Sequence, residues 1–482
     1  MHSELNNKVL TATKWSATTE IVAKLVTPIT SMVLARLLTP EAFGVVTTLT
    51  MVITFAELFT DAGFQKYLVQ HDFKDDKDRD ESTTVAFWSN LILSIVVWGI
   101  ISVFNRQIAI LVGSPGLGHV LIIACASIPL AAFSSIQSAL FRRDLDFRTL
   151  FKVRIVSTII PLLITVPLAF YIRNYWALVI GTLTVNTVNA ILLTIYSKWK
   201  PRFFYSLTKF KEMFSFTFWS VLEAISIWLT RYVDVFIVGT MLSQYYLGLY
   251  KTSSALVGQI MGIVTAITTP ILFSALSRLQ NDEDGFKRLF FRFQKIVGLL
   301  VIPLGFGIFL FKDFVTTIIL GDQWTQCSGF VGLWALTSSV VIVLSHYSSE
   351  IYRSKGKPKL SVLSQFIHIC FLWPTVLISV NYGFESLYIS RSVVRLTGIV
   401  INLCIMGVVV KMPVGKMIIN VLPSCVAALS MGLVLLLPSS EETLMNLLYA
   451  CIAALIYIIV IYLFPEERRI IKELPGIINI RG

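Results

Sequence analysis

The chain is divided into about fourteen apolar stretches, each long enough for a helix to cross the roughly 30 Å hydrocarbon core of a bilayer. Only 14% of the 482 residues are charged, whereas soluble domains carry about 25%. This pattern predicts an all-α polytopic membrane protein with little soluble mass. The expected spans are 11–35, 42–64, 83–104, 117–141, 149–171, 175–196, 214–240, 244–274, 289–311, 328–352, 359–381, 383–409, 417–437 and 444–464.

The Lys and Arg residues fall almost entirely in every second gap between these stretches. On this assignment 31 of the 40 basic residues lie on one side of the membrane, and only Arg36, Arg106, Arg173 and Lys312 lie on the other. Cytoplasmic loops carry the excess of Lys and Arg, so both termini are expected in the cytoplasm. The net charge of +12 is therefore interpreted as a membrane-orientation signal and not as nucleic-acid binding.

The sequence also contains an internal repeat. A shift of 204 residues aligns residues 15–47 with residues 219–251 without a gap. Six spans separate the two copies, so both have the same orientation, and the repeat axis is expected along the membrane normal. We therefore expect two six-helix lobes, residues 1–200 and 201–410, related by a parallel pseudo-two-fold. Residues 411–482 would add two further spans and a cytoplasmic tail.

Several classes of protein are disfavoured. The outer loops are short, and the chain has no G-x-x-x-x-G-K-[ST] loop for ATP. A polytopic enzyme such as a polysaccharide polymerase or glycosyltransferase would need a sizeable catalytic loop. The six cysteines are scattered without metal spacing. We expect a transporter and not an enzyme, without metal or organic cofactor; a scaffold role would leave the charges inside the spans unexplained.

A set of short motifs follows one another along the chain. They are Leu-Ala-Arg-Leu-Leu-Thr-Pro-Glu-Ala-Phe-Gly at 34–44, Asp-Ala-Gly-Phe at 61–64, Leu-Phe-Arg-Arg-Asp-Leu-Asp-Phe at 140–147, Leu-Gly-Leu-Tyr at 247–250, Ser-Arg-Leu-Gln at 277–280, Pro-Leu-Gly at 303–305 and Leu-Gly-Asp-Gln-Trp at 320–324. In this order they resemble the polysaccharide flippase (Wzx-like) branch of the multidrug/oligosaccharidyl-lipid/polysaccharide exporter superfamily. With the fourteen-span layout, the resemblance covers essentially the whole chain.

The resemblance implies a function and partners. Such proteins move an oligosaccharide repeat unit, linked through diphosphate to a polyprenol, across the bacterial cytoplasmic (inner) membrane for surface or exopolysaccharide assembly. It implies a V-shaped two-lobe fold, alternating access and a cationic cavity. The partners would be the lipid-linked oligosaccharide, membrane lipids, and polysaccharide polymerase and chain-length proteins. A cation-coupled multidrug exporter on the same fold is the alternative, but it would need a more acidic cavity.

Apart from the basic residues near the cytoplasmic ends of the spans, which are counted with the cytoplasmic side, five basic residues lie inside the expected spans. A cation is costly there and marks a functional site by default. The five are Arg391, Arg395, Arg231, Lys24 and Lys251. Arg391 and Arg395 are four residues apart and share a helix face. Arg is also the better bidentate partner for phosphate. We therefore predict that these five side chains bind the diphosphate and sugar groups, the two arginines foremost.

Acidic neighbours leave local ion pairs as an open alternative for two of these cations. Asp234 follows Arg231 by three residues, and Glu223 precedes it by two turns on a similar face. Glu20 precedes Lys24 by four residues, which is the favourable order for an ion pair on a helix. These three acids are also candidates for ion coupling.

Further candidates lie on the second, seventh and eighth spans. Glu57 and Asp61 are four residues apart, and a buried carboxylate there could bind Na⁺ or exchange a proton. A structural role at the helix end is the alternative for Asp61. Lys251 could instead snorkel to the membrane surface. Three aromatic residues of the seventh span could stack on sugar rings or simply pack in the core: Trp219, Trp228 and Tyr232.

Overall fold

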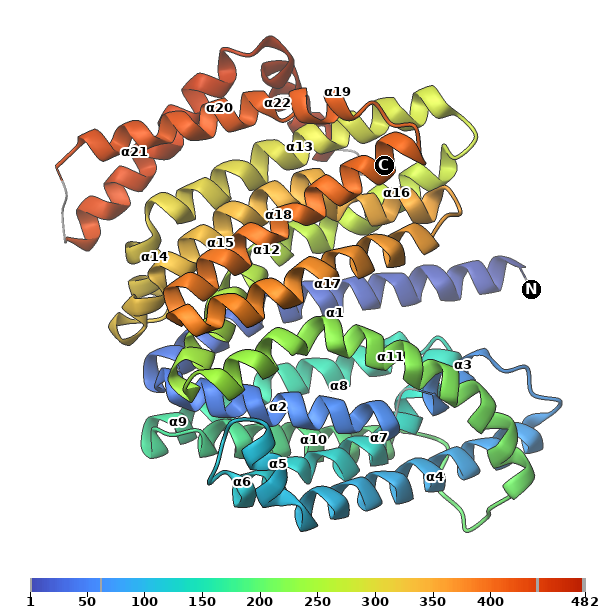
Figure 1. Cartoon of the computed structure of the whole chain (residues 1–482). Helices are drawn as coiled ribbons and strands as arrows, with labels where there is room; N and C mark the ends of the chain where they lie inside the picture. Colours follow the sequence, from blue (N-terminus) through green and yellow to red (C-terminus); the bar gives the residue numbers. More distant parts are fainter. Residues whose placement is uncertain (1, 61–62, 439–441, 479–482) are drawn as a thin grey trace. The chain divides into compact units, whose positions relative to one another are not determined.

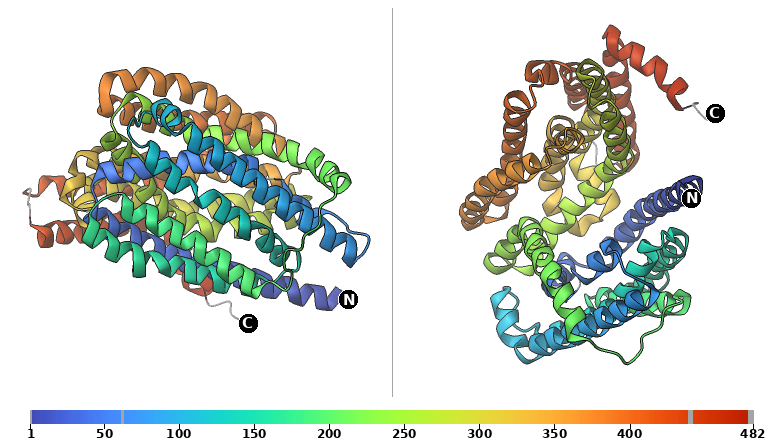
Figure 2. Two further views of the ribbon diagram at one scale, coloured as in Figure 1. Left: turned by 90° about the horizontal axis from the view of Figure 1, so that it is seen from below. Right: turned by 90° about the vertical axis from the view of Figure 1, so that its right-hand side faces the viewer.

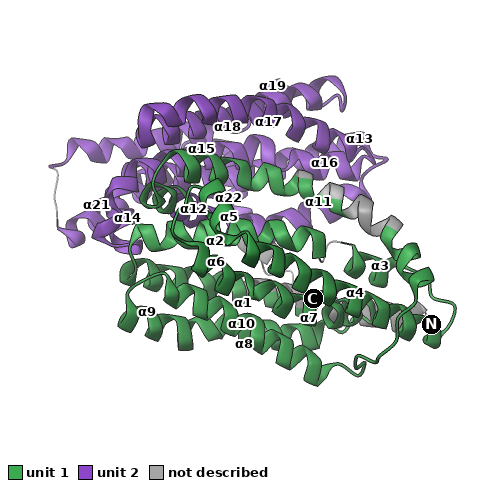
Figure 3. Cartoon of the chain, turned by 60° about the horizontal axis from the view of Figure 1, so that its bottom comes forward, with its two compact units in different colours: residues 1–251 green, residues 252–482 purple. Residues whose placement is uncertain are grey.

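A computed structural model describes residues 2–60, 63–438 and 442–478 of the chain. Regular secondary structure in this described part is helical throughout (Figures 1 and 2). Packing divides the chain into two compact units, Met1–Lys251 and Thr252–Gly482, which are coloured separately in Figure 3. Each unit is a bundle in which long helices lie side by side.

The first unit is built on four helix pairings. α10 packs on α7, α1 packs on α8, α4 packs on α7, and α11 packs on α2. Its helices are α1 (His2–Leu37), α2 (Pro40–Thr60), α3 (Phe64–Gln70), α4 (Asp76–Val103), α5 (Asn105–Leu111), α6 (Gly118–Cys125), α7 (Ser127–Arg143), α8 (Phe147–Ile160), the π-helical η1 (Pro161–Thr165), α9 (Val166–Ile172), α10 (Trp176–Tyr196), α11 (Leu207–Met241) and the first two turns of α12 (Gln244–Arg278).

The second unit is centred on α13, α15, α17 and α18. α13 packs on α15 and α20, and α18 packs on both α15 and α17. Besides the rest of α12, its helices are α13 (Glu283–Leu310), α14 (Lys312–Ile319), η2 (Asp322–Cys327), α15 (Ser328–Val341), the π-helical η3 (Ile342–His346), α16 (Ser348–Ser354), α17 (Lys359–Ser379), η4 (Val380–Tyr382), α18 (Gly383–Val408), α19 (Val414–Ile419), α20 (Leu422–Ser430), η5 (Met431–Leu436), α21 (Thr443–Tyr462) and α22 (Pro465–Ile478).

Long apolar helices dominate both units, as the sequence predicts for a multi-pass membrane protein. In the described residues, eleven helical runs are long and apolar enough to cross a membrane. The expected spans 359–381 and 383–409 lie within a single run, interrupted at η4 and at Gly383, whose φ is +92°. The expected spans 11–35 and 214–240 lie in α1 and α11, which are not among the eleven runs. The count of fourteen stays a prediction.

The helix boundaries follow the 204-residue repeat. α1 ends at Leu37 and α11 ends 204 residues later at Met241, while α2 begins at Pro40 and α12 begins 204 residues later at Gln244. By packing, the first compact unit extends to residue 251, and α11 lies against α2, α3 and α4 within it. The lobes 1–200 and 201–410 stay a prediction.

The equivalent starts of α2 and α12 are packed against each other through glycine. A Cβ on Gly44 would lie 1.9 Å from the carbonyl oxygen of Gln244, and a Cβ on Gly248 would lie 1.8 Å from the carbonyl oxygen of Pro40. The 204-residue shift relates Pro40 to Gln244 and Gly44 to Gly248, so each contact is the equivalent of the other. The contact is therefore reciprocal, as a local two-fold rotation requires, and only glycine permits this approach of backbone to backbone.

The polar side chain of Asn402, in α18, forms hydrogen bonds with three other elements of the second unit. The Asn402 amide nitrogen donates to Ser345 Oγ at 2.8 Å and to the Gly398 carbonyl at 2.9 Å. The Asn402 amide oxygen accepts from Tyr352 Oη and Ser364 Oγ, both at 3.0 Å. All four hydrogen-bonding positions of this amide are thus used, and η3, α16 and α17 are tied to α18.

We expect Asn402→Leu to destabilise the purified protein by about 2 kcal/mol, since hydrogen bonds between helices in membranes contribute about 0.6 kcal/mol each. Asn381→Leu is the matched control, because the Asn381 amide in η4 donates only to carbonyls of the preceding turn at the end of α17, such as that of Leu377 at 2.8 Å. Thermal unfolding in detergent measures both variants. Equal unfolding temperatures for the two variants would contradict the assigned role of Asn402.

Candidate functional site

In the second unit, the two arginines of α18 lie against one tryptophan of α15. The guanidinium carbons of Arg391 and Arg395 lie 5.1 Å and 3.8 Å from the centroid of the Trp334 ring. Arg395 Nη1 also donates a hydrogen bond to Ser338 Oγ, at 2.8 Å. The spacing of four residues therefore does place both arginines on one face, and that face is directed at α15.

The electrostatics of this pair depend on the indole ring. Two guanidinium groups so close repel each other, and each gains about 0.5–2 kcal/mol from the negative face of a tryptophan. Trp334 is largely buried, with 9% of its surface exposed. The ring supports both charges without neutralising them, so an anion that contacts both guanidinium groups would relieve their repulsion.

In the first unit, a cavity of about 310 Å³ lies between α2 and α11. It brings together two residues that the sequence singled out separately, Glu57 and Arg231. Arg231 is exposed. The remaining lining residues are Thr54, Leu58, Ala224, Ile227, Trp228 and Tyr232. This α2/α11 cavity therefore combines a cation, a carboxylate and an aromatic wall.

The aromatic wall of the α2/α11 cavity is fixed by several contacts. The rings of Trp228 and Tyr232 are stacked with centroids 5.4 Å apart and an interplanar angle of 26°. Trp228 Nε1 donates to Thr54 Oγ1 at 3.2 Å. Lys251 Nζ lies 5.4 Å from the centroid of the Tyr232 ring. Three of the predicted charged residues, Arg231, Lys251 and Glu57, thus lie around one pair of rings.

The other predicted residues of the first unit lie elsewhere. Asp234 is buried, and its carboxylate accepts hydrogen bonds from Tyr250 Oη at 2.7 Å and from the Val235 backbone N–H at 2.9 Å. Lys24 is half-buried on α1. Asp61 and the side chains of three more predicted residues lie outside the described residues: Glu20, Glu223 and Trp219. Their roles, and the ion pairs expected with the two glutamates, stay predictions.

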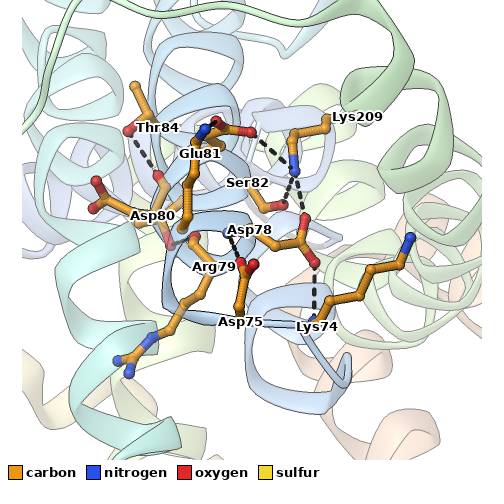
Figure 4. Close-up of polar contacts among 11 residues, drawn as sticks. Lys74, Asp75, Asp78, Arg79, Asp80, Glu81, Ser82, Thr84 and Lys209 are labelled. Carbon is orange, nitrogen blue, oxygen red and sulfur yellow. Dashed lines mark hydrogen bonds and ion pairs between the residues drawn. The ribbon is translucent and has the colours of Figure 1, made fainter.

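An ionic cluster that the sequence analysis did not identify joins the start of α4 to the start of α11. Figure 4 shows the Lys209 ammonium between two acids of α4, Asp78, with which it forms an ion pair, and Glu81, at 3.4 Å. Arg202 Nη1 lies 3.2 Å from Asp80. We call this group the α4–α11 clasp. The clasp holds the connection between α10 and α11 against α4. The acidic residues within 75–81 were the sequence signal that could have predicted it.

Aromatic contacts continue the clasp along α4. Trp88 Nε1 donates to the Arg202 carbonyl at 2.7 Å, and the Trp88 ring stacks on Phe203 with centroids 5.4 Å apart. Ser89 Oγ lies 3.1 Å from Tyr205 Oη. The basic and aromatic connection, 197–206, therefore packs along α4 over much of its length.

We expect Lys209→Met to lower the stability of the purified protein by about 2 kcal/mol, since hydrogen bonds to charged groups contribute about 1.5–3 kcal/mol. The Lys209 side chain is only 17% exposed, and its loss leaves Asp78 with the Lys74 backbone N–H as a hydrogen-bond donor but without its ion-pair partner. Lys211→Met, on an exposed side chain two residues further on, is the control. Thermal unfolding in detergent should separate the two variants; coinciding curves would exclude a stabilising clasp.

The fold defined by these helices is that of the exporters expected from the sequence. The chain superposes on the lipid II flippase MurJ in its inward closed conformation with a TM-score of 0.72, 15% identity and coverage of 94% of this chain and 99% of that one. An inward-facing multidrug resistance transporter of the MOP superfamily gives a TM-score of 0.59, with 13% identity over 82% of this chain and 95% of that one.

Sequence similarity assigns the chain to a narrower family than the fold does. The family of polysaccharide biosynthesis proteins matches residues 33–329, more than half of the chain, and the chain belongs to that family. An uncharacterized membrane protein in the cps region of Klebsiella pneumoniae is 23% identical over 78% of this chain and 77% of its own length. The succinoglycan biosynthesis transport protein ExoT of Rhizobium meliloti is 24% identical over 66% and 64%, respectively. The lipopolysaccharide biosynthesis protein WzxC of Escherichia coli is 20% identical over 67% and 65%. The resemblance to Wzx-like proteins is thereby confirmed.

Proposed function

We propose that this protein translocates a polyprenyl-diphosphate-linked oligosaccharide repeat unit from the inner to the outer leaflet of the bacterial cytoplasmic membrane. The product would be used in surface polysaccharide or exopolysaccharide assembly. Membership of the polysaccharide biosynthesis family supports this function, as do relatives named for succinoglycan transport and lipopolysaccharide biosynthesis. The protein would act by alternating access and without catalysing a covalent step.

The observation that carries the proposal is the placement of Arg391 and Arg395 on the face of Trp334. A diphosphate linkage has two fixed negative charges that must be sheltered from hydrocarbon during translocation. Two guanidinium groups on one helix face offer parallel N–H donors that match phosphate oxygens, and such charge-assisted bonds are strong.

The α2/α11 cavity suits the sugar part of the same cargo. Stacked aromatic rings such as Trp228 and Tyr232 present apolar faces against which a sugar ring can lie, while Trp228 Nε1 stays hydrogen-bonded to Thr54. Arg231 and Lys251 provide donors for hydroxyl or phosphate oxygens at the edge of these rings. We propose that Lys24 contributes to the same cargo path from α1.

The membrane orientation and the energy source belong to the proposal. We propose that both termini lie in the cytoplasm, which the distribution of basic residues supports. The driving ion would be Na⁺ or H⁺, and Glu57 is the coupling candidate best placed in the described part, since it lines the α2/α11 cavity beside Arg231. Polysaccharide polymerase and chain-length proteins would receive the exported repeat unit.

A cation-coupled multidrug exporter is the second candidate, and it is supported by the fold shared with a multidrug resistance transporter. Such a protein needs a carboxylate that is exposed to its cationic drug. In the α2/α11 cavity the carboxylate of Glu57 shares the lining with the cation Arg231, which is less suited to a cationic drug. Deleting the gene would then raise sensitivity to cationic drugs and leave surface polysaccharide unchanged.

Deletion of the gene in its own bacterium tests the proposed function. We expect loss of one surface or secreted polysaccharide and accumulation of the lipid-linked repeat unit on the inner leaflet, both reversed by the wild-type gene on a plasmid. The polysaccharide is measured on the cell surface, and the intermediate is measured by mass spectrometry of extracted lipids. Normal polysaccharide without accumulated intermediate would refute the proposal.

We expect Arg231→Gln to reduce export about tenfold in the complemented strain, because a hydrogen bond between a charged donor and the cargo contributes about 1.5–3 kcal/mol. Arg231→Lys should recover part of the activity, since the charge is kept and the bidentate geometry is lost. Immunoblots of the membrane fraction control for insertion. Full export by the Arg231→Gln variant would remove Arg231 from the site.

A further inference from the structure

The second unit contains a strongly basic cavity that the proposed transport path does not use. It measures about 970 Å³ and lies where α13, α19 and α22 come together. Seven of its lining residues are cationic and two are acidic. The cations are Arg288, Arg292, Lys295, Lys416, Arg468, Arg469 and Lys472, and the acids are Glu466 and Glu473. We call it the α13/α22 pocket.

Two of the seven cations are neutralised by acids of α22. Arg292 Nη2 lies 2.7 Å from Glu473 Oε2. Lys295 forms an ion pair with Glu466 and lies 3.2 Å from the buried Glu467. The hydrogen bond from Lys295 lowers the pKa of the Glu466 carboxyl, which therefore stays ionised at neutral pH. These pairs attach α22 to α13.

The remaining five cations carry the net charge of the pocket. Arg288, Lys416, Arg468, Arg469 and Lys472 are exposed and form no salt bridge among the described residues. Lys416 and Arg469 still lie close enough to Glu466 to help lower the pKa of its carboxyl. Lys416 Nζ lies 4.9 Å from the ring centroid of a lining residue on α13, Phe291. Seven cations and two acids leave an excess of five positive charges around one cavity. These charges repel each other, and an anion within the cavity would offset that repulsion.

The framework beneath these charges is fixed by buried hydrogen bonds. The Asn420 amide nitrogen donates to the Phe291 carbonyl at 2.9 Å and to Gln294 Oε1 at 3.0 Å. Asn420 and Gln294 are both buried. Since Asn420 follows α19 directly, these bonds hold the helix that carries Lys416 against α13. The basic side chains therefore project from a rigid base on three helices.

The position of α22 relates the pocket to a membrane surface. α22 begins three residues after the apolar span α21 ends at Tyr462. Its sequence, Pro-Glu-Glu-Arg-Arg-Ile-Ile-Lys-Glu-Leu-Pro-Gly-Ile-Ile, is strongly amphipathic. The helix carries three acids and three bases, so it is amphipathic without a net charge. An amphipathic helix at this place is typical of one that lies in the interface, where its Lys and Arg side chains can meet lipid phosphates.

We propose that the α13/α22 pocket binds the phosphate headgroup of an anionic glycerophospholipid from the inner leaflet. The proposal rests on the orientation given under the proposed function, with α22 at the cytoplasmic surface. Basic pockets between spanning helices on that side suit anionic headgroups. A membrane lipid fits better than a soluble anion, because the pocket adjoins the end of a span and an interfacial helix.

The test uses purified full-length protein and native mass spectrometry with added dioleoylphosphatidylglycerol or dioleoylphosphatidylcholine. One variant carries Arg468→Gln, Arg469→Gln and Lys472→Gln together. Its matched control carries Arg154→Gln, Lys211→Gln and Lys359→Gln, which removes the same charge from exposed positions outside the pocket. Each basic residue near an anionic lipid surface contributes about fivefold, so the pocket variant should bind phosphatidylglycerol on the order of 100-fold more weakly.

Each outcome of the lipid-binding experiment either supports or overturns the proposal. Wild-type and control proteins that prefer phosphatidylglycerol, beside a pocket variant that does not, would support the proposal. Equal loss in both variants, or equal binding of the two lipids by the wild type, would overturn it. Displacement of the lipid by inorganic phosphate at the same concentration would assign the pocket to a soluble anion instead and would also overturn it.

Two further variants keep the test decisive. If the triple variant unfolds in phosphatidylcholine, Arg288→Gln with Lys416→Gln probes the same pocket from α13 and α19. The export-site variant Arg391→Gln with Arg395→Gln should still bind phosphatidylglycerol like the wild type. Failure of lipid binding alone would leave the proposed transport function standing, and failure of export alone would leave the lipid site standing.

Discussion

Replacement of Arg391 and Arg395 together by Gln is expected to lower polysaccharide export by on the order of 100-fold or more, since each charge-assisted bond to phosphate contributes about 1.5–3 kcal/mol. Glutamine keeps much of the length and some donors of arginine but carries no charge. The remaining contacts, including the hydrogen bond between position 395 and Ser338, are too weak to replace two guanidinium groups. Surface polysaccharide and accumulated lipid-linked intermediate are measured in the complemented deletion strain.

Three controls separate charge from structure at this site. The double Lys variant should restore part of the export if charge matters, and less than all of it because Lys lacks the bidentate fork. Trp334→Phe keeps an aromatic face and should be milder than Trp334→Leu. Lys359→Gln, an exposed position, removes a charge elsewhere in the same unit. Near-normal export by the correctly inserted double Gln variant would exclude both arginines from cargo binding.

Gly44→Ala and Gly248→Ala are each expected to destabilise the protein by about 3 kcal/mol, at the upper end of the range for overpacking. The added methyl group would lie within 2 Å of a backbone oxygen, that of Gln244 in one case and that of Pro40 in the other. A backbone atom cannot rotate away as a long side chain can, so the helices themselves must separate. Thermal unfolding in detergent and the yield of inserted protein measure the effect.

Two helical glycines provide the controls for this prediction. A Cβ on Gly99 in α4 or on Gly258 in α12 would meet nothing within 4 Å. Ala at those positions should be neutral or slightly stabilising, because Ala favours helix over Gly by about 1 kcal/mol. If Gly44→Ala unfolds at the same temperature as Gly99→Ala, the reciprocal contact between α2 and α12 does not support the fold.

Much of the helical architecture was predictable from the sequence. Apolar length alone indicates most spans, and the repeat places the ends of α1 and α11 at equivalent residues, Leu37 and Met241. The spacing of Arg391 and Arg395 likewise predicts a shared face. These features depend on local periodicity and on chain length, which a sequence records directly.

The partners of the candidate residues were not predictable in the same way. Nothing near Arg395 in the sequence indicates Trp334, which lies about sixty residues earlier on another helix. The hydrogen bond of Asp234 with Tyr250 and the clasp of Lys209 with Asp78 also join distant segments. Such contacts depend on which helices pack together, and packing is settled by many weak interactions that have no short sequence signature.

The sequence by itself determined that this chain crosses a membrane many times and that residues 15–47 recur at 219–251, and it predicts a few cations within the spans. Charge and hydropathy are sums over neighbouring residues, so they can be read along one dimension. Only the tertiary structure decided that α11 packs with the first unit and that the two arginines of α18 share one indole. The reason is that close packing selects partners by shape across the whole bundle, as the reciprocal glycine contact of α2 and α12 illustrates.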